Sequence, residues 1–127
     1  MKLIKENWWK VLAIMLLLYA IIMGFMGTVP DLPVVQQTIR NIYFHVGMWF
    51  SMMFVLGISV FYSIRYLLSN NPEYDLKARD GATIGIVLGC LGLLTGMIWA
   101  KNTWGHYWIQ DPKLNGAAVS MLAYLAY

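Results

Sequence analysis

Cysteine and charge are both scarce in this 127-residue sequence. The single cysteine, Cys90, has no partner for an intramolecular disulfide, and no CxxC pair is present for zinc or thiol redox chemistry. We interpret Cys90 as a small buried hydrophobic residue. Charged residues make up 12% of the sequence, roughly half the share of a soluble domain. This shortage of charge excludes an ordinary water-soluble domain.

Long apolar runs stand where charge is missing. A helix crosses about 30 Å of hydrocarbon with about 20 apolar residues. The sequence predicts such helices near 11–29, 41–68 and 81–100, and a fourth helix over 114–127 that begins where too few residues remain for a full span. We therefore predict an all-α polytopic membrane bundle, with 1–127 as one membrane domain. The run over 11–29 is too long for a signal peptide and lacks a cleavage motif, so we expect it to be retained.

The basic residues predict which way the bundle faces. Loops on the cytoplasmic side carry more Lys and Arg than loops on the outer side. The N-terminal tail and the segment 65–80 hold three each, whereas 30–40 holds one and 101–113 holds two. We expect the N-terminus in the cytoplasm and the segment 99–114 at the outer face. The basic residues form no patch that follows a nucleic-acid backbone, so we expect a lipid bilayer as partner and no nucleic acid.

Small residues recur along the third predicted helix. Glycines stand every three or four residues, at Gly81, Gly85, Gly89, Gly92 and Gly96. Such a stripe lets a neighbouring helix approach closely. A flat wall for a flat ligand is a second interpretation, compatible with the first.

His45 is the one histidine inside the predicted spans. Ionisable residues inside a membrane are costly and often functional. Trp49 and Met52 follow at helical spacing and share its face. Imidazole is a common axial ligand of haem iron, and an indole stacks on a macrocycle. From spacing alone the alternative is favoured, a histidine whose ring is hydrogen-bonded at the interface.

Aromatic residues crowd the segment 99–114, which we call the tryptophan-rich segment. It contains Trp99, Trp104, Gly105, Tyr107, Trp108 and the pair Asp111-Pro112. An interfacial belt needs fewer aromatic residues at a helix end. If the segment is helical, Trp104, Trp108 and Asp111 share one side. A short amphipathic helix on the outer surface then presents an aromatic platform to a planar, apolar ligand.

These residues resemble a known family. Residues 104–114 look like the tryptophan-rich WWD signature of the haem-handling proteins of cytochrome c maturation. Residues 95–99 resemble the helix end leading into it, and 40–46 resemble the stretch with the first outer histidine of the haem exporter protein C (CcmC) family. The related CcsA family shares the signature. The similarity covers residues 8–127 in the family's order and spacing.

The resemblance implies a multi-pass protein of the bacterial inner membrane, with the tryptophan-rich segment on the periplasmic side. It implies non-covalent haem b over that segment, with His45 as an axial iron ligand. The implied haem-contacting residues are His45, Trp49, Trp99, Trp104, Gly105, Tyr107, Trp108 and Asp111. The implied partners are an ABC-type transporter, CcmA with CcmB, and the haem chaperone CcmE, which receives the haem. Binding and handover require no catalysis, so we do not expect an enzyme.

The sequence departs from the family pattern at three points. Tyr107 and Gln110 stand where the family often has tryptophan, and His106 occupies a variable position that we expect to face solvent. The second axial histidine of the family belongs to a later outer loop, so we expect this sequence to be an N-terminal part. Two other functions stay open: a haem-containing quinol-oxidising electron-transfer subunit, which usually needs paired histidines, and an assembly subunit without a ligand.

Overall fold

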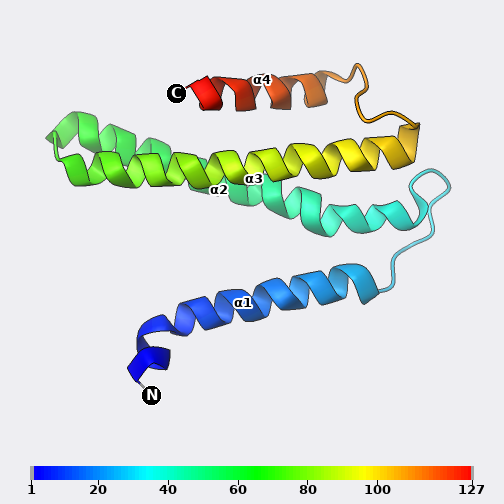
Figure 1. Ribbon diagram of the computed structural model, residues 1–127, viewed down its shortest axis with the longest axis horizontal. Coiled ribbons are helices and arrows are strands. Elements are labelled where there is room, and N and C mark those ends of the chain that lie inside the picture. Colours follow the sequence, from blue (N-terminus) through cyan, green and yellow to red (C-terminus); the bar gives the residue numbers. More distant parts are fainter. Residues whose placement is uncertain (1, 127) are drawn as a thin grey trace.

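The computed structural model describes residues 2–126, and these form helices joined by short connections (Figure 1). The elements are α1 (Lys2–Met26), the 3-10 helix η1 (Gln36–Arg40), α2 (Asn41–Ser69), α3 (Pro72–Trp104) and α4 (Pro112–Ala126). No strand occurs among the described residues. The predicted all-α bundle is therefore confirmed, while Tyr127, the end of the predicted fourth helix, lies outside the described residues.

Three of the helices are long and apolar enough to cross a membrane. The first candidate span is Glu6–Met26, and the others extend over Gln36–Ser69 and Pro72–Trp104. Four consecutive residues of α1, 16–19, are each more than half exposed. Because four residues go once around a helix, α1 exposes apolar side chains on every side, as a helix surrounded by lipid does.

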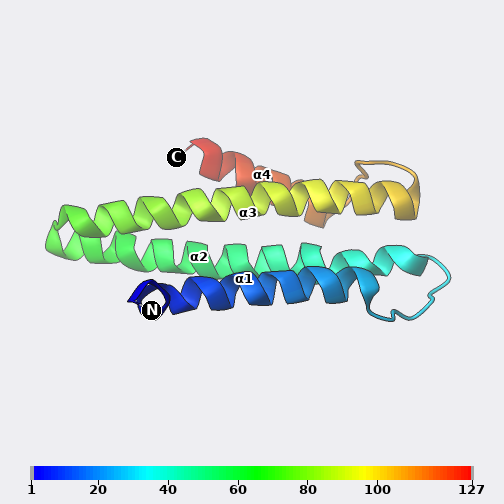
Figure 2. The same cartoon turned by 60° about the horizontal axis from the view of Figure 1, so that its bottom comes forward.

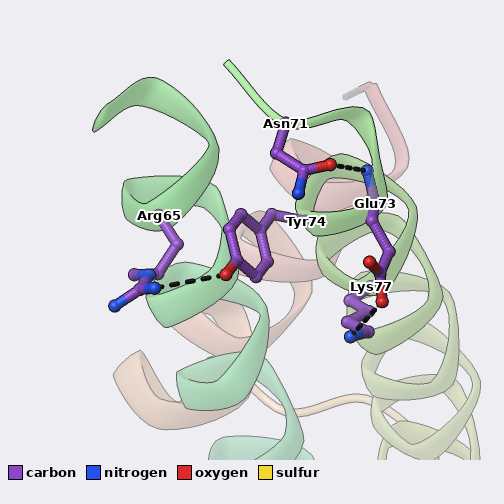
Figure 3. A network of polar contacts seen from close by, with 5 residues as sticks. All are labelled: Arg65, Asn71, Glu73, Tyr74 and Lys77. Carbon is purple, nitrogen blue, oxygen red and sulfur yellow. Dashed lines mark hydrogen bonds and ion pairs between the residues drawn. The ribbon is translucent and has the colours of Figure 1, made fainter. Parts of the chain in front are cut away.

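The helix that carries the glycines is longer than the predicted 81–100. Asn71 caps its N-terminus by accepting a hydrogen bond from the Glu73 amide at 3.0 Å, and Pro72 occupies its first turn. Figure 3 shows this turn, where Arg65 donates to the Tyr74 hydroxyl at 3.2 Å. Strong capping signals extend the helix through a charged stretch that an apolar run alone does not include.

The core of the molecule is the antiparallel pair of α2 and α3. The five glycines of α3 meet α2 side chains in one continuous register. In the order Gly81, Gly85, Gly89, Gly92 and Gly96, the nearest α2 side chains are Ser59, Leu56, Met52, Trp49 and His45. From Gly85 to Gly96 each step of three or four residues on α3 matches an equal step on α2, and the first step is four residues on α3 against three on α2. The predicted packing stripe is confirmed, and it places His45 at the end of the register.

The flanking helices α1 and α4 pack less extensively against the central pair. In both views α1 lies beside α2 and α4 beside α3, on opposite sides of the central pair (Figures 1 and 2). Phe25 of α1 contacts Phe44 of α2 with ring centroids 5.0 Å apart. Arg40 donates to the carbonyl of Gly27 at 2.6 Å, which ties the first loop back to α1. The loops 27–35 and 105–111 lie at the same end of the bundle, opposite the α2–α3 turn (Figure 2).

Candidate functional site

A cavity of about 570 Å³ opens at the end that carries these two loops. This volume is in the usual range for small-molecule sites. Its walls come from α2, α3, the loop before α4, and α4 itself. The lining residues are His45, Trp49, Gly92, Leu93, Gly96, Trp99, Ala100, Trp104, Ile109, Asp111, Lys113, Leu114 and Ala117. We call this the outer cavity, after the face at which the sequence predicts the tryptophan-rich segment.

The imidazole of His45 is held on several sides. Its ring lies against Gly96, whose missing side chain makes room for it. The indoles of Trp49 and Trp99 meet it edge-on, with centroids 6.1 and 5.9 Å away and ring planes inclined by 75°. The His45 Nδ1 atom lies 3.1 Å from the hydroxyl of Thr95. The ring is thus fixed by packing and by one polar contact.

Five of the eight predicted haem-contacting residues come together at the outer cavity. They are His45, Trp49, Trp99, Trp104 and Asp111. Trp99 is held by its indole N–H, which donates to the Thr38 hydroxyl at 3.2 Å. The other three predicted residues, Gly105, Tyr107 and Trp108, are not among the lining residues.

The tryptophan-rich segment does not form a continuous helix. The α3 helix ends at Trp104 because Gly105 adopts a left-handed conformation (φ 83°), a common helix stop. Residues 105–111 are then non-helical. Trp108 is exposed and donates its indole N–H to Asn115 at 3.1 Å. The conditional interpretation of an amphipathic helix with Trp104, Trp108 and Asp111 on one side is therefore wrong for this segment.

Asp111 caps a helix in addition to lining the outer cavity. Its carboxylate accepts hydrogen bonds from the amides of Lys113 at 2.7 Å and Leu114 at 3.2 Å. These are amides at the first turn of α4, so Asp111 caps that helix. The Asp-Pro pair that precedes an apolar run is the sequence signal for such a cap. The cap fixes the entry of α4 beside the outer cavity.

Some of the remaining lining residues were not predicted from the sequence. They include Leu93, Ala100, Ile109 and Ala117, which are apolar and carry no chemical signal. Only the packing of α4 against α3 brings them to one wall. The charges of the lining are the carboxylate of Asp111 and the ammonium of Lys113. Lys101 is not among the lining residues and lies over the ring of Tyr107, 5.5 Å from its centroid.

Comparison with known proteins adds a decisive observation. The family model described as Heme exporter protein C matches residues 2–127. The chain belongs to the haem exporter protein C family. Membership agrees with the resemblance carried by residues 40–46 and 95–114, and with the membrane helices described above.

Curated relatives of this haem exporter protein C family member carry consistent names. "Heme exporter protein C" of Bradyrhizobium diazoefficiens is 36% identical over 89 residues, which are 69% of this chain and 34% of the relative. The protein of the same name from Rhodobacter capsulatus is 31% identical over 120 residues, 94% of this chain and 49% of the relative. "Cytochrome c biogenesis protein CcsA" of Prochlorococcus marinus is 44% identical over 59 residues, 46% of this chain and 19% of the relative.

The chain spans about a third to a half of the two haem exporter relatives. No solved structure matches it.

Proposed function

We propose that this chain holds non-covalent haem b at the outer face of the membrane for cytochrome c maturation, with His45 as an axial ligand of the iron. One observation carries the proposal. The outer cavity brings His45 and Trp49 of α2 together with the indoles of Trp99 and Trp104, which follow His45 in the sequence by more than fifty residues. A metal-ligating imidazole among flat aromatic rings suits an iron porphyrin.

The other residues of the outer cavity also fit a haem. Its wall includes Gly92 and Gly96, against which Trp49 and His45 pack, and apolar side chains of α3 and α4. Lys113 supplies a cation for a haem propionate. Among the described residues no three His, Cys, Asp or Glu side chains gather to hold a bare metal ion. A porphyrin supplies four nitrogen ligands itself, so one imidazole is a meaningful contribution.

We place the cavity on the periplasmic side of a bacterial inner membrane. The Lys and Arg counts support a cytoplasmic N-terminus. In this arrangement the protein works with the ABC-type transporter subunits CcmA and CcmB and hands haem to the chaperone CcmE. The task is binding and release, so no residue is assigned a catalytic role.

Haem binding by the purified chain in lipid nanodiscs tests the proposal. We expect His45→Ala to lose haem or shift the Soret band, and we expect the matched variant His106→Ala to behave as wild type, since His106 is exposed and does not line the cavity. Trp104→Ala should weaken binding more than Trp108→Ala, because only Trp104 lines the cavity. Unchanged haem content and Soret position in His45→Ala would refute the ligand assignment.

The same preparation separates the alternative functions. Rapid reduction of bound haem by a quinol, with turnover, would indicate an electron-transfer subunit instead. Haem-free protein that still associates with the ABC-type transporter would indicate an assembly subunit. The proposed function predicts haem binding without quinol turnover.

A further inference from the structure

We propose that Thr95 is a positioning residue that sets the tautomer of His45, keeping hydrogen on Nδ1 and leaving the Nε2 lone pair free for a metal. The inference rests on the proposed ligand role of His45 for its purpose. The tautomer itself depends only on the contacts that Thr95 makes with His45 and with its own helix.

The hydroxyl of Thr95 has two acceptors within its own helix. Its Oγ1 atom lies 2.9 Å from the carbonyl oxygen of Leu91 and 3.0 Å from that of Gly92. A hydroxyl has one hydrogen to donate, and it accepts through its lone pairs. With the hydrogen directed to these carbonyls, Oγ1 presents a lone pair to the His45 Nδ1 atom at 3.1 Å. In this arrangement Nδ1 carries the hydrogen and donates it to Oγ1.

The carbonyls of Leu91 and Gly92 are the acceptors that hold the hydroxyl hydrogen of Thr95 within α3. A carbonyl accepts and never donates. The hydroxyl oxygen is then the acceptor that faces the ring, and this favours the Nδ1–H tautomer. Since a neutral imidazole has one N–H, Nε2 is the nitrogen that keeps its lone pair.

The position of Thr95 suits a residue that acts from behind the ring. It lines a neighbouring cavity but not the outer cavity, whereas His45 lines the outer cavity. The Asn41 side chain, one turn before His45 on α2, donates to the Thr95 carbonyl at 3.1 Å. Two successive turns of α2 thus hold Thr95 through its carbonyl and its hydroxyl. Ligating histidines generally use their other N–H in this way, which orients the ring.

Nitrogen NMR of the haem-free chain tests the tautomer directly. The full chain is labelled with ¹⁵N-histidine and reconstituted in nanodiscs, with His106→Gln removing the second signal. We expect the Nδ1–H tautomer in the otherwise wild-type chain and in Thr95→Ser, which keeps the hydroxyl. Thr95→Val and Thr95→Ala should shift the population toward Nε2–H. Thr83→Val is the matched control, because Thr83 also donates to its own helix, at 2.9 Å from the Arg79 carbonyl, but is remote from His45.

An Nε2–H tautomer in the chain with native Thr95, or an unchanged population in both Thr95→Val and Thr95→Ala, would overturn the proposal. The measurement without a substitution at Thr95 stands even if a variant does not fold. Haem titration is the second readout. We expect Thr95→Val to weaken haem binding by about 10- to 100-fold and Thr95→Ser to retain it. Failure of the native chain to bind haem refutes the proposed function and leaves the tautomer result in place. Haem binding through His45 with the wrong tautomer refutes the positioning role alone.

Discussion

Gly96 is the position at which a single methyl group most directly probes the His45 site. A Cβ atom added there lies 2.8 Å from Cε1 of the imidazole, where ordinary contact begins at 3.4 Å. The ring must therefore withdraw by about 0.6 Å, the difference between these two distances. Trp49 and Trp99 stand at its sides, so it cannot withdraw freely.

The magnitude follows from known costs of overpacking. An extra methyl group in a packed site costs about 1–3 kcal/mol, while alanine gains up to about 1 kcal/mol over glycine in a helix. The two terms partly cancel in the free energy of unfolding, so global stability is a poor measure. They do not cancel in haem affinity, because haem ligation requires the His45 imidazole to keep its position against Gly96. We expect Gly96→Ala to weaken haem binding by roughly 5- to 150-fold.

Haem titration in nanodiscs, followed at the Soret band, measures this effect. The matched control is Gly47→Ala, since Gly47 lies two residues from His45 on α2 but a Cβ there meets nothing within 4 Å. We expect the control to bind as wild type. Wild-type affinity and an unchanged spectrum in Gly96→Ala would refute the packing of the His45 imidazole against Gly96.

Three further predictions concern the scaffold. Gly85→Ala should lower the free energy of unfolding by about 1–3 kcal/mol, because its Cβ would lie 2.5 Å from a Leu56 methyl carbon. Steric-trap unfolding measures this loss, and Gly57→Ala is the control, since a Cβ there meets nothing within 4 Å. A loss in Gly85→Ala no larger than that of the control would contradict the prediction. Asp111→Ala should remove the α4 cap, at about 1 kcal/mol, and accelerate amide exchange in the first turn of α4 by about fivefold. Asp111→Asn should preserve protection, and equal exchange in all three chains would argue against the cap. Ser59→Ala should lower the free energy of unfolding by about 0.6 kcal/mol, because the buried hydroxyl donates to the Ala78 carbonyl of α3 at 2.6 Å. Chemical denaturation in detergent measures the change. A gain in stability would be inconsistent with this hydrogen bond.

The sequence predicted the membrane spans well because their signal is local. A run of apolar residues long enough to cross hydrocarbon is visible without any knowledge of partners. The helix ends were predicted less well. The α3 helix begins at Pro72 and continues to Trp104, since capping by Asn71 and the left-handed Gly105 set its ends, whereas hydropathy marks only its apolar middle.

The glycine stripe shows how far a pattern reaches. Its spacing predicted close helix packing, and the structure pairs each glycine with an α2 side chain. The spacing did not identify the partner helix or the register. Only the antiparallel pairing of α2 with α3 decides that Gly96 receives His45, because a shift of one turn would place Trp49 there instead.

The candidate site likewise combines features that the sequence predicts with features that only the tertiary structure decides. The sequence by itself determined the chemistry: one imidazole in a membrane span, several indoles, and an Asp-Pro helix start, all recognisable from residue type and spacing. The tertiary structure decided which of these meet. Trp104 lines the cavity and Trp108 does not, because Gly105 ends the helix between them and turns the chain. The contact of Thr95 with His45 spans fifty residues, and such a contact exists only once two helices have packed.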